Sequence, residues 1–338
     1  MTQQQLITRS YTMRFLTPAF LGDAVRAGAW RMPPFKAALR QWWRIAVASQ
    51  FQYDCLKMRE AEGQLFGHAW LENDRDESGK CVSARRSQVR MRLDRWVPGR
   101  LDQAPEIGRI ERAGGKPASA ALYLGYGPIE TESTLKSKPA IKAGEERTLK
   151  LAFPEADGIE AALALMNRFG TVGGRCRNGW GSFELAGELT PTSTPLVEWR
   201  DAMKRDWVHG IGQDQKGALI WESMSAKDWE AVMLLLARLR ADLRRNVSDR
   251  LLLAYPDTKA SMPGWRGTDR VPHSLRFKVR RRGEGYVGAI FHAPCRPSDA
   301  LWSRLSPEKQ QQLPEVFQEA HDFLDSRDEL TRCNEVKP

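Results

Sequence analysis

The residues of this chain that are best suited to chemistry lie together, in the stretch RFGTVGGRCRNGWGSFEL between residues 168 and 185. Glycine has no Cβ and tolerates positive φ, so its backbone amides can approach an anion closely. Arginine supplies planar donors for phosphate, and tryptophan offers a face on which a base can stack. The stretch holds all three kinds of residue, together with Asn178: Gly170, Gly173, Gly174, Gly179, Gly181, Arg168, Arg175, Arg177 and Trp180. This mixture predicts contact with the phosphates and bases of a nucleic acid.

Two familiar nucleotide-binding loops do not fit this stretch. In a dinucleotide-binding loop the glycines follow a strand and open a helix, whereas here they follow a predicted helix and lead into a predicted strand. A Walker loop needs Gly-Lys before Ser or Thr, but Gly115-Lys116 is followed by Pro117. A second interpretation needs no ligand: Gly170 ends the helix as a C-cap, and a flexible turn follows. Both interpretations stay open on the sequence.

The elements around this stretch follow from the period of the apolar residues. Alternation of apolar and polar residues indicates strands, and an apolar residue every three or four positions indicates a helix. These periods predict strands at 6–17, 82–93, 123–128, 146–153 and 182–189, and helices at 34–49 and 159–169. With insertions set aside, the order strand, helix, strand, strand, helix, strand predicts a ferredoxin-like unit, a topology that RNA-recognition modules also use.

The second half of the chain repeats parts of this pattern. A Thr/Pro-rich segment at 190–195 is typical of a linker. Ser225 then caps a strong amphipathic helix, and two strands at 275–279 and 286–291 are joined by a turn at 283–285. No second glycine-rich loop follows, so this half is a degenerate copy of the first.

We therefore predict an α+β protein of two ferredoxin-like domains in tandem. Residues 1–190 form the first domain, which carries the glycine-rich loop, and residues 196–338 form the second, with C-terminal helices. Residues 97–120 have prolines, glycines and cations but no hydrophobic period, and we interpret them as a long basic insertion. The length of 338 residues also favours two domains over one.

Two further sets of cations have regular spacing. One lies on the predicted helix 34–49 at i,i+4 steps, and the other on one face of the predicted strand 82–93. The helical set is Lys36, Arg40 and Arg44, and the strand set is Arg86, Arg90 and Arg92. Each set either contacts phosphate or has a plainer role, as a solvated helix face or as an edge strand that resists aggregation.

Trp42 and Trp43 are adjacent on the same predicted helix. Adjacent helical positions point about 100° apart. We expect one of the two rings to lie in the core and the other to face RNA or a neighbouring subunit.

Composition excludes several classes of protein. The chain has 52 Lys+Arg against 42 Asp+Glu, a formal charge of +10, which is typical of a polyanion binder but also of a protein that is merely kept in solution. No apolar run approaches the ~20 residues that cross a bilayer, and the polar start is not a secretory signal, so we expect no membrane contact and a cytoplasmic location. The five scattered cysteines and the acidic turn at 72–79 match no metal motif, so we expect no cofactor.

Together these segments resemble the RAMP superfamily of CRISPR proteins, whose diagnostic feature is a glycine-rich loop after the last helix of a ferredoxin-like fold. Four motifs narrow the resemblance to the first RAMP subunits of Cmr (type III-B) effector complexes. They are Thr17–Gly22, Leu39–Arg44, Glu62–Gly67 and Gly173–Phe183. In the second half, Pro272-His273 stands where a small residue and proline are expected.

The resemblance implies a non-catalytic RNA-binding subunit near the crRNA 3′ end, which helps to capture target RNA in antiviral defence. It also implies crRNA, target RNA and other Cmr-type RAMP subunits as partners, and target cleavage by the repeated backbone subunit. The cations, Asn178, Trp180 and the loop glycines named above are then the expected RNA contacts.

Two rival functions stay open. Some RAMP relatives are metal-independent endoribonucleases that process crRNA precursors, and that chemistry needs a histidine near a cation. The histidines are His68, His209, His273, His292 and His321. None lies in the glycine-rich stretch, and His68 is the least implausible catalyst. The other rival is a scaffold whose basic surface binds only acidic proteins. Protein contacts release far fewer counterions than phosphate contacts, so the salt dependence of RNA retention distinguishes the two functions.

Overall fold

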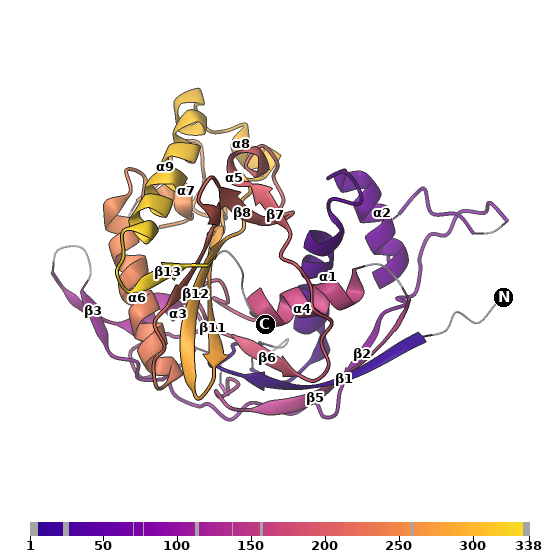
Figure 1. The fold of residues 1–338 in the computed structure, drawn as a ribbon, viewed down its shortest axis with the longest axis horizontal. Coiled ribbons are helices and arrows are strands. Elements are labelled where there is room, and N and C mark those ends of the chain that lie inside the picture. The colour runs from indigo at the N-terminus through magenta and orange to yellow at the C-terminus, as the bar shows by residue number, and fades with distance from the viewer. Residues whose placement is uncertain are drawn as a thin grey trace.

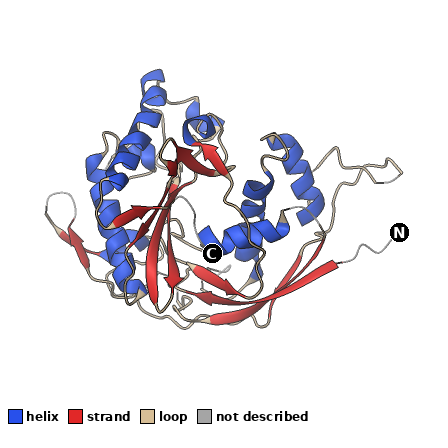
Figure 2. Cartoon of the chain, in the orientation of Figure 1, coloured by secondary structure: helices blue, strands red, loops and turns tan. Residues whose placement is uncertain are grey.

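Helices and antiparallel sheets make up the described chain, which confirms the predicted α+β class (Figure 2). The structure is a computed structural model and describes residues 6–22, 27–69, 71–76, 78–111, 115–136, 138–155, 158–257 and 260–333. Among these residues no helix is long and apolar enough to cross a membrane.

Four strands form the first sheet, in the order β2-β5-β1-β6. They are β1 (Leu6–Phe15), β2 (Arg90–Leu93), β5 (Glu146–Pro154) and β6 (Phe183–Ala186). Two helices, α1 (Met32–Val47) and α4 (Ile159–Phe169), pack together and cover one face (Figure 1). The alternation of β1 explains this: Tyr11, Met13 and Phe15 are buried, while the residues between them face away from the core.

The second sheet has the order β11-β12-β10-β13. Its strands are β10 (Ile220–Ser223), β11 (Leu275–Arg282), β12 (Gly285–His292) and β13 (Leu330–Arg332). Its long helices are α6 (Trp229–Asn246), capped by Asp228 rather than Ser225, and α9 (Pro307–Asp325). In both sheets the first strand of the chain lies between the third and the fourth, and a helix follows the first and the third.

The insertion has more structure than its composition predicted. Residues 97–125 include β3 (Arg109–Glu111), β4 (Pro117–Ser119) and α3 (Ala120–Gly125), while residues 112–114 lie outside the described residues. The strand predicted at 123–128 is therefore wrong, because Ser119 caps a short helix there. Both α3 and β3 pack against α6, so the insertion shares a core with the second half of the chain.

The strand predicted at 82–93 is reduced to β2. Upstream of Arg90 the chain forms a bridge between His68 and Arg85 instead of a ladder. Buried polar groups decide this, because Asp74 binds both His68 and Arg85 in that segment. A period of two alone does not distinguish such a segment from a strand.

Both Trp42 and Trp43 are 3% exposed, so the expectation that one of them faces outward is wrong. Trp42 packs against Phe169 and Phe291, and Trp43 against Phe51 and Phe66. Helix α1 is covered on two flanks: by α4 with β12, and by the helix α2 (Cys55–Phe66) that follows it. Sequence spacing gives the directions in which the two tryptophan side chains point, but it does not show which elements pack against each side of the helix.

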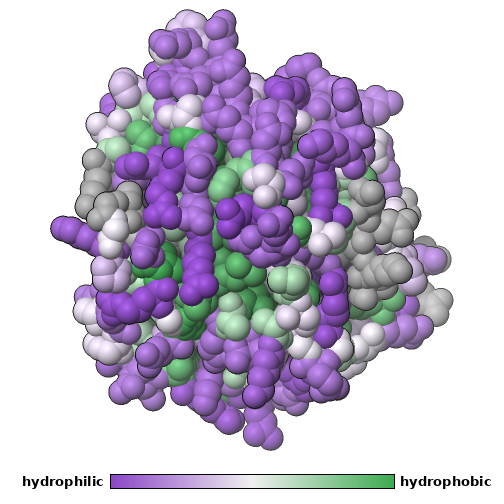
Figure 3. Space-filling model, turned by 60° about the vertical axis from the view of Figure 1, so that its left-hand side comes forward, coloured by the Kyte–Doolittle hydropathy of each residue, from purple (hydrophilic) through white to green (hydrophobic). Residues whose placement is uncertain are grey.

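The remaining elements are short. They are β7 (Leu196–Glu198), α5 (Trp199–Ala202), β8 (Ile211–Asp214), β9 (Gly217–Ala218), α7 (Arg250–Leu253) and α8 (Asp299–Trp302). The first four of these lie between β6 and β10 along the chain, and α7 and α8 lie within the second half. On the face shown in Figure 3, hydrophilic side chains surround a smaller central area of apolar ones.

Candidate nucleic-acid interface

The glycine-rich loop (residues 170–182) begins where α4 ends. The Gly170 amide donates to the carbonyl oxygen of Met166 at 2.8 Å, so Gly170 is a helix C-cap. The loop is not a flexible turn, however. Arg177 and Asn178 run beside β11, where the Phe277 amide donates to the Arg177 carbonyl oxygen at 3.0 Å. The loop thus joins the first sheet to the second.

The loop glycines make room for protein backbone. A Cβ on Gly181 would lie 1.8 Å from the carbonyl oxygen of Val172, and one on Gly173 would lie 2.8 Å from that of Phe20. Both glycines have positive φ, 65° and 97°. Gly179, with φ of 92°, faces the Met233 side chain, and Gly174 faces Pro128. The close approach predicted for RNA at these positions is made by the chain itself.

Three expected RNA ligands point into the protein. The Trp180 ring is 0% exposed and packs against Phe20 and Trp229, so the prediction that a base stacks on it is wrong. The guanidinium of Arg168 donates to Thr192 and Thr194 in the linker. The side-chain Nδ2 of Asn178 donates to the Leu124 carbonyl oxygen at 2.7 Å. These side chains hold the loop in place.

Arg177 lies at a pocket between the two halves of the chain. This junction pocket, of about 350 Å³, is lined by α1, the loop, β11 and the segment after β12. Its charged lining residues are Arg44, Arg177, Arg270, Arg276 and Arg296 against the single carboxylate of Asp206. Such a pocket is suited to an anion.

Arg177 and Arg276 have no ion pair with a carboxylate within the described ranges. Arg177 donates to the His273 carbonyl oxygen at 3.3 Å, and the Nε of Arg276 is buried without a partner. Burial, and then the charge of Arg177, lower the pKa of Arg276 to about 10. A buried charge is costly unless it is paired. A bound phosphate would supply the missing negative charge.

Two more groups extend this cluster, half-buried Arg240 and buried His273, and the sequence assigned neither to an RNA contact. Arg240 on α6 donates to the Asn178 side-chain oxygen, and burial lowers its pKa to about 10. His273 is buried beside Arg177, with a pKa well below the usual range because of burial and then the charge of Arg240. Its Nδ1 accepts the Leu275 amide, and its Nε2 has no partner in the part of the chain that the structure describes. Only the tertiary contact with β11 brings these residues to the loop.

Arg175 is the loop cation that stays exposed. Its φ of 56° is in the left-handed region, which is uncommon for a residue with a side chain. Its Nε donates to the carbonyl oxygen of Tyr126 at 2.6 Å. The Nη groups remain at the surface of the loop.

The cation ladder on α1 is largely occupied within the protein. Arg40 and Arg44 both bind the Glu62 carboxylate at 2.6 Å, and that side chain is buried under α1. Lys36 is half-buried, and burial followed by the charge of Arg40 lowers its pKa. Arg40 and Arg44 are therefore ion-pair partners of Glu62 and not free phosphate ligands.

The strand cations face outward. Arg86, Arg90 and Arg92 are exposed, and Arg92 lies directly opposite Lys150 on β5. Like charges in such a cross-strand pair repel each other. This edge of the first sheet is therefore a second cationic surface.

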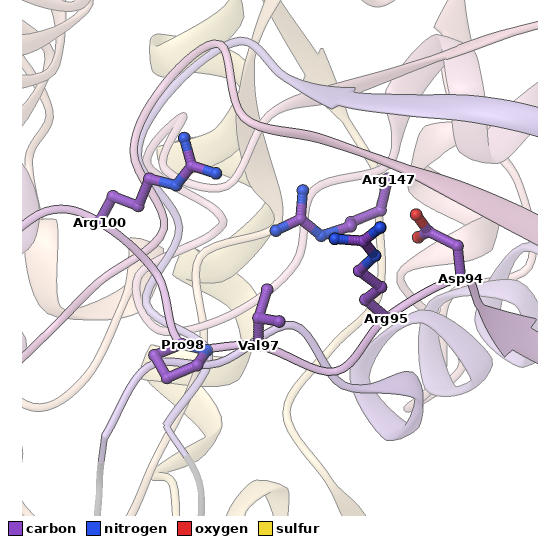
Figure 4. A pocket seen from close by; sticks show the side chains of 6 residues that line it. All are labelled: Asp94, Arg95, Val97, Pro98, Arg100 and Arg147. Carbon is purple, nitrogen blue, oxygen red and sulfur yellow. The ribbon is translucent and has the colours of Figure 1, made fainter.

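A second cationic pocket, of about 250 Å³, lies near the start of β5. Figure 4 shows Arg95, Arg100 and Arg147 around it, with the carboxylate of Asp94 at one side. The Arg147 guanidinium lies over the Trp30 ring, and its Nε is buried without a partner in the described chain. Arg147 is distant in sequence from Arg95 and Arg100, so no spacing signal connects it with them.

His68 is engaged on both ring nitrogens. Its Nε2 lies 2.6 Å from the Asp74 carboxylate, and its Nδ1 accepts the Leu71 amide. Hydrogen bonds from Arg85 and then His68 hold the pKa of Asp74 well below its usual range. His292 and His321 bond to each other in the second core, and no metal-binding cluster of His, Cys, Asp or Glu occurs among the described residues.

A match to a family model fits this arrangement. The model of the RAMP superfamily matches residues 12–184, which is more than half of the chain and includes the whole glycine-rich loop. The chain belongs to the RAMP superfamily. As a RAMP protein it is also similar to the CRISPR system Cmr subunit Cmr1-1 of Pyrococcus furiosus, at 23% identity over 276 residues, 78% of this chain and 69% of the relative.

Solved structures show a weaker likeness to this RAMP protein. The apo crystal structure of Cmr1 from Pyrococcus furiosus is 16% identical with a TM-score of 0.44, covering 91% of this chain and 96% of that one. A chain of the type III-B Cmr-beta complex bound to cognate target RNA and AMPPnP is 12% identical with a TM-score of 0.43, covering 93% and 99%.

Proposed function

We propose that this chain is a non-catalytic, RNA-binding subunit of a type III-B CRISPR effector ribonucleoprotein. Membership of the RAMP superfamily and the similarity to a Cmr subunit support the assignment to such a complex. In this proposal the chain sits near the crRNA 3′ end, helps to capture target RNA, and has other Cmr-type RAMP subunits as neighbours.

The observation that carries the RNA-binding proposal is the pair of guanidinium groups at the junction pocket, one half-buried (Arg177) and one buried (Arg276). Arg177 and Arg276 lack carboxylate partners among the described residues. The pocket's Arg44 and Arg296, by contrast, are paired with Glu62 and Asp299. Planar donors of this kind match phosphate oxygens in pairs. A protein-only scaffold would not need two neighbouring guanidinium groups without a carboxylate partner.

We also infer the domain organisation from the two sheets. Each combines strand, helix, strand, strand, helix, strand with the same spatial order, which is the arrangement of a ferredoxin-like unit. We place residues 1–190 in the first unit and residues 196–338 in the second. In this division the insertion belongs to the first unit by sequence and supports the second by its packing on α6.

Salt-dependent RNA binding tests the proposal. The full chain is titrated with single-stranded RNA at several salt concentrations, and the slope of log affinity against log salt is measured. Each phosphate contact contributes about 0.7 to that slope for a single strand. We expect Arg177→Gln to weaken binding and to reduce the slope by about 0.7.

The matched control is Arg327→Gln, because Arg327 lies far along the chain and is paired with Glu329. It removes the same charge and should leave the slope unchanged. Equal slopes for Arg177→Gln and the parent protein would show that the junction pocket does not bind RNA. A parent protein without any salt-dependent RNA binding would favour the scaffold alternative.

A further inference from the structure

We propose that Tyr126 is a stacking platform for an RNA base and that Arg175 beside it binds the adjoining phosphate. This inference rests on the proposed RNA-binding function and adds to it a binding site for one nucleotide. It concerns the turn after α3, which lies beyond the insertion and outside the glycine-rich loop.

Tyr126 is exposed without an obvious structural reason. Its side chain is 56% exposed, although it follows directly on the buried residues Leu124 and Gly125. Tyrosine offers a flat apolar face that any base can use, and such stacking is typical of single-strand binding sites. The aromatic ring that the sequence suggested for this role, Trp180, is buried beneath the same turn.

Arg175 is fixed against this turn. Its Nε donates to the Tyr126 carbonyl oxygen at 2.6 Å, and its Nη2 lies 3.7 Å from where a Cβ on Gly127 would be. Partial burial and then the charge of Arg270 lower the pKa of Arg175, while the phenol of Tyr126 raises it. The guanidinium therefore lies against the turn that carries the Tyr126 ring.

Hydrogen bonds hold the backbone at Arg175 in an uncommon conformation. A non-glycine residue in the left-handed region persists only where its surroundings fix it. Here the Asn178 amide donates to the Arg175 carbonyl oxygen at 2.9 Å, and the Gly174 amide donates to that of Phe20 at 2.9 Å. These backbone bonds fix the conformation at Arg175, and its own bond to the Tyr126 carbonyl oxygen keeps the side chain on the turn.

The support beneath Tyr126 is rigid. Trp180 Nε1 lies 3.1 Å from where a Cβ on Gly125 would be, so the turn rests directly on the buried ring. Asn178 also donates to the Leu124 carbonyl oxygen at 2.7 Å. The loop therefore presents Tyr126 and Arg175 as one preformed surface, which lowers the ordering cost of binding.

Charge favours a nucleotide over a neutral ligand at this surface. Arg175 has no ion pair with a carboxylate in the described part of the chain, and Arg240 and Arg270 are close enough to affect its electrostatics. An acidic peptide could satisfy the guanidinium but would leave the tyrosine face without a flat partner. Single-stranded RNA supplies both groups at once.

The test separates stacking from phosphate binding. Affinity of the full chain for a mixed-sequence single-stranded RNA is measured across a salt series for Tyr126→Leu, Tyr126→Phe and Arg175→Gln. We expect Tyr126→Leu to weaken binding roughly 5- to 100-fold with an unchanged salt slope, because stacking releases no counterions. Tyr126→Phe should bind like the parent, and Arg175→Gln should reduce the slope by about 0.7.

Each contrary outcome has a distinct meaning. If Tyr126→Leu binds RNA like the parent protein, the stacking inference fails while the proposed function stands. A changed slope in Tyr126→Leu would show that the residue acts through phosphate contacts and would also overturn the inference. A poly-glutamate peptide that competes with RNA in a Tyr126-dependent manner would assign the surface to an acidic protein. Absence of RNA binding by the parent protein would reject the proposed function itself.

Discussion

The side-chain nitrogen of Lys278 lies 2.8 Å from the carbonyl oxygen of Gly170. The same nitrogen donates to the Asn167 carbonyl oxygen at 2.6 Å, so a strand of the second sheet caps the C-terminus of α4. The Val279 amide next to it donates to the Ser182 hydroxyl at 2.9 Å, at the far end of the glycine-rich loop. Strand β11 thereby fixes both ends of the loop.

Lys278→Met should lower the free energy of unfolding by about 1–3 kcal/mol. Methionine keeps the apolar stem of the side chain but leaves the carbonyl oxygens of Asn167 and Gly170 without this buried donor. Urea unfolding measures the change. Lys204→Met, at an exposed lysine, is the control and should stay within about 0.5 kcal/mol of the parent. Equal stability of the two variants would contradict the capping role.

Trp42→Ala and Trp43→Ala should each cost about 3–5 kcal/mol of stability, because both rings are buried. Trp96→Ala is the matched control, since that ring is 65% exposed, and it should change stability by no more than about 0.5 kcal/mol. Thermal or urea unfolding compares the three variants. A large loss of stability in only one of Trp42→Ala and Trp43→Ala would contradict the burial of both rings. It would support the expectation from spacing that one ring lies in the core and the other at the surface.

Stability should fall as the pH drops below about 6.5. Burial, followed by the charges of Arg332 and Arg200, lowers the pKa of His321 to about 3, and burial likewise holds the pKa of His292 well below its usual range. Below pH 6.5 these histidines bind protons in the unfolded chain but not in the folded one. Each therefore removes roughly 1.4 kcal/mol per pH unit as the pH falls.

Replacing His321 by Gln isolates this effect from that of the carboxylates. Urea unfolding between pH 6.5 and pH 4 should show a slope smaller by about 1.4 kcal/mol per pH unit in His321→Gln than in the parent. The same slope in both proteins would mean that His321 is already protonated in the fold.

The purified chain should not cleave crRNA precursor or guide-complementary RNA, with or without magnesium or manganese. His68 is buried and held by Asp74, and His273 is buried beside Arg177, so neither is available as an acid or base at the surface. Gel analysis of labelled RNA tests this. Cleavage that is lost in His68→Ala or His273→Ala, and that survives repurification, would favour the ribonuclease alternative.

Local sequence patterns determined the α+β class and the position of the glycine-rich loop. They also determined β1 and β5, the strands that precede α1 and α4. The period of apolar residues, two in a strand and 3.6 in a helix, depends only on neighbouring residues. A glycine cluster after a helix is likewise recognised without knowing what packs against it. The four RAMP motifs are likewise local, which is why the superfamily could be expected before the fold was known.

Tertiary structure alone decided which loop side chains are available. Trp180, Arg168 and Asn178 have the right chemistry for RNA, but the insertion, the linker and α6 bury them or occupy their hydrogen bonds. The junction pocket joins Arg177 to Arg276, 99 positions further along the chain, and no sequence period connects residues so far apart. Burial and charge pairing depend on what packs against a residue, and packing is a property of the whole fold.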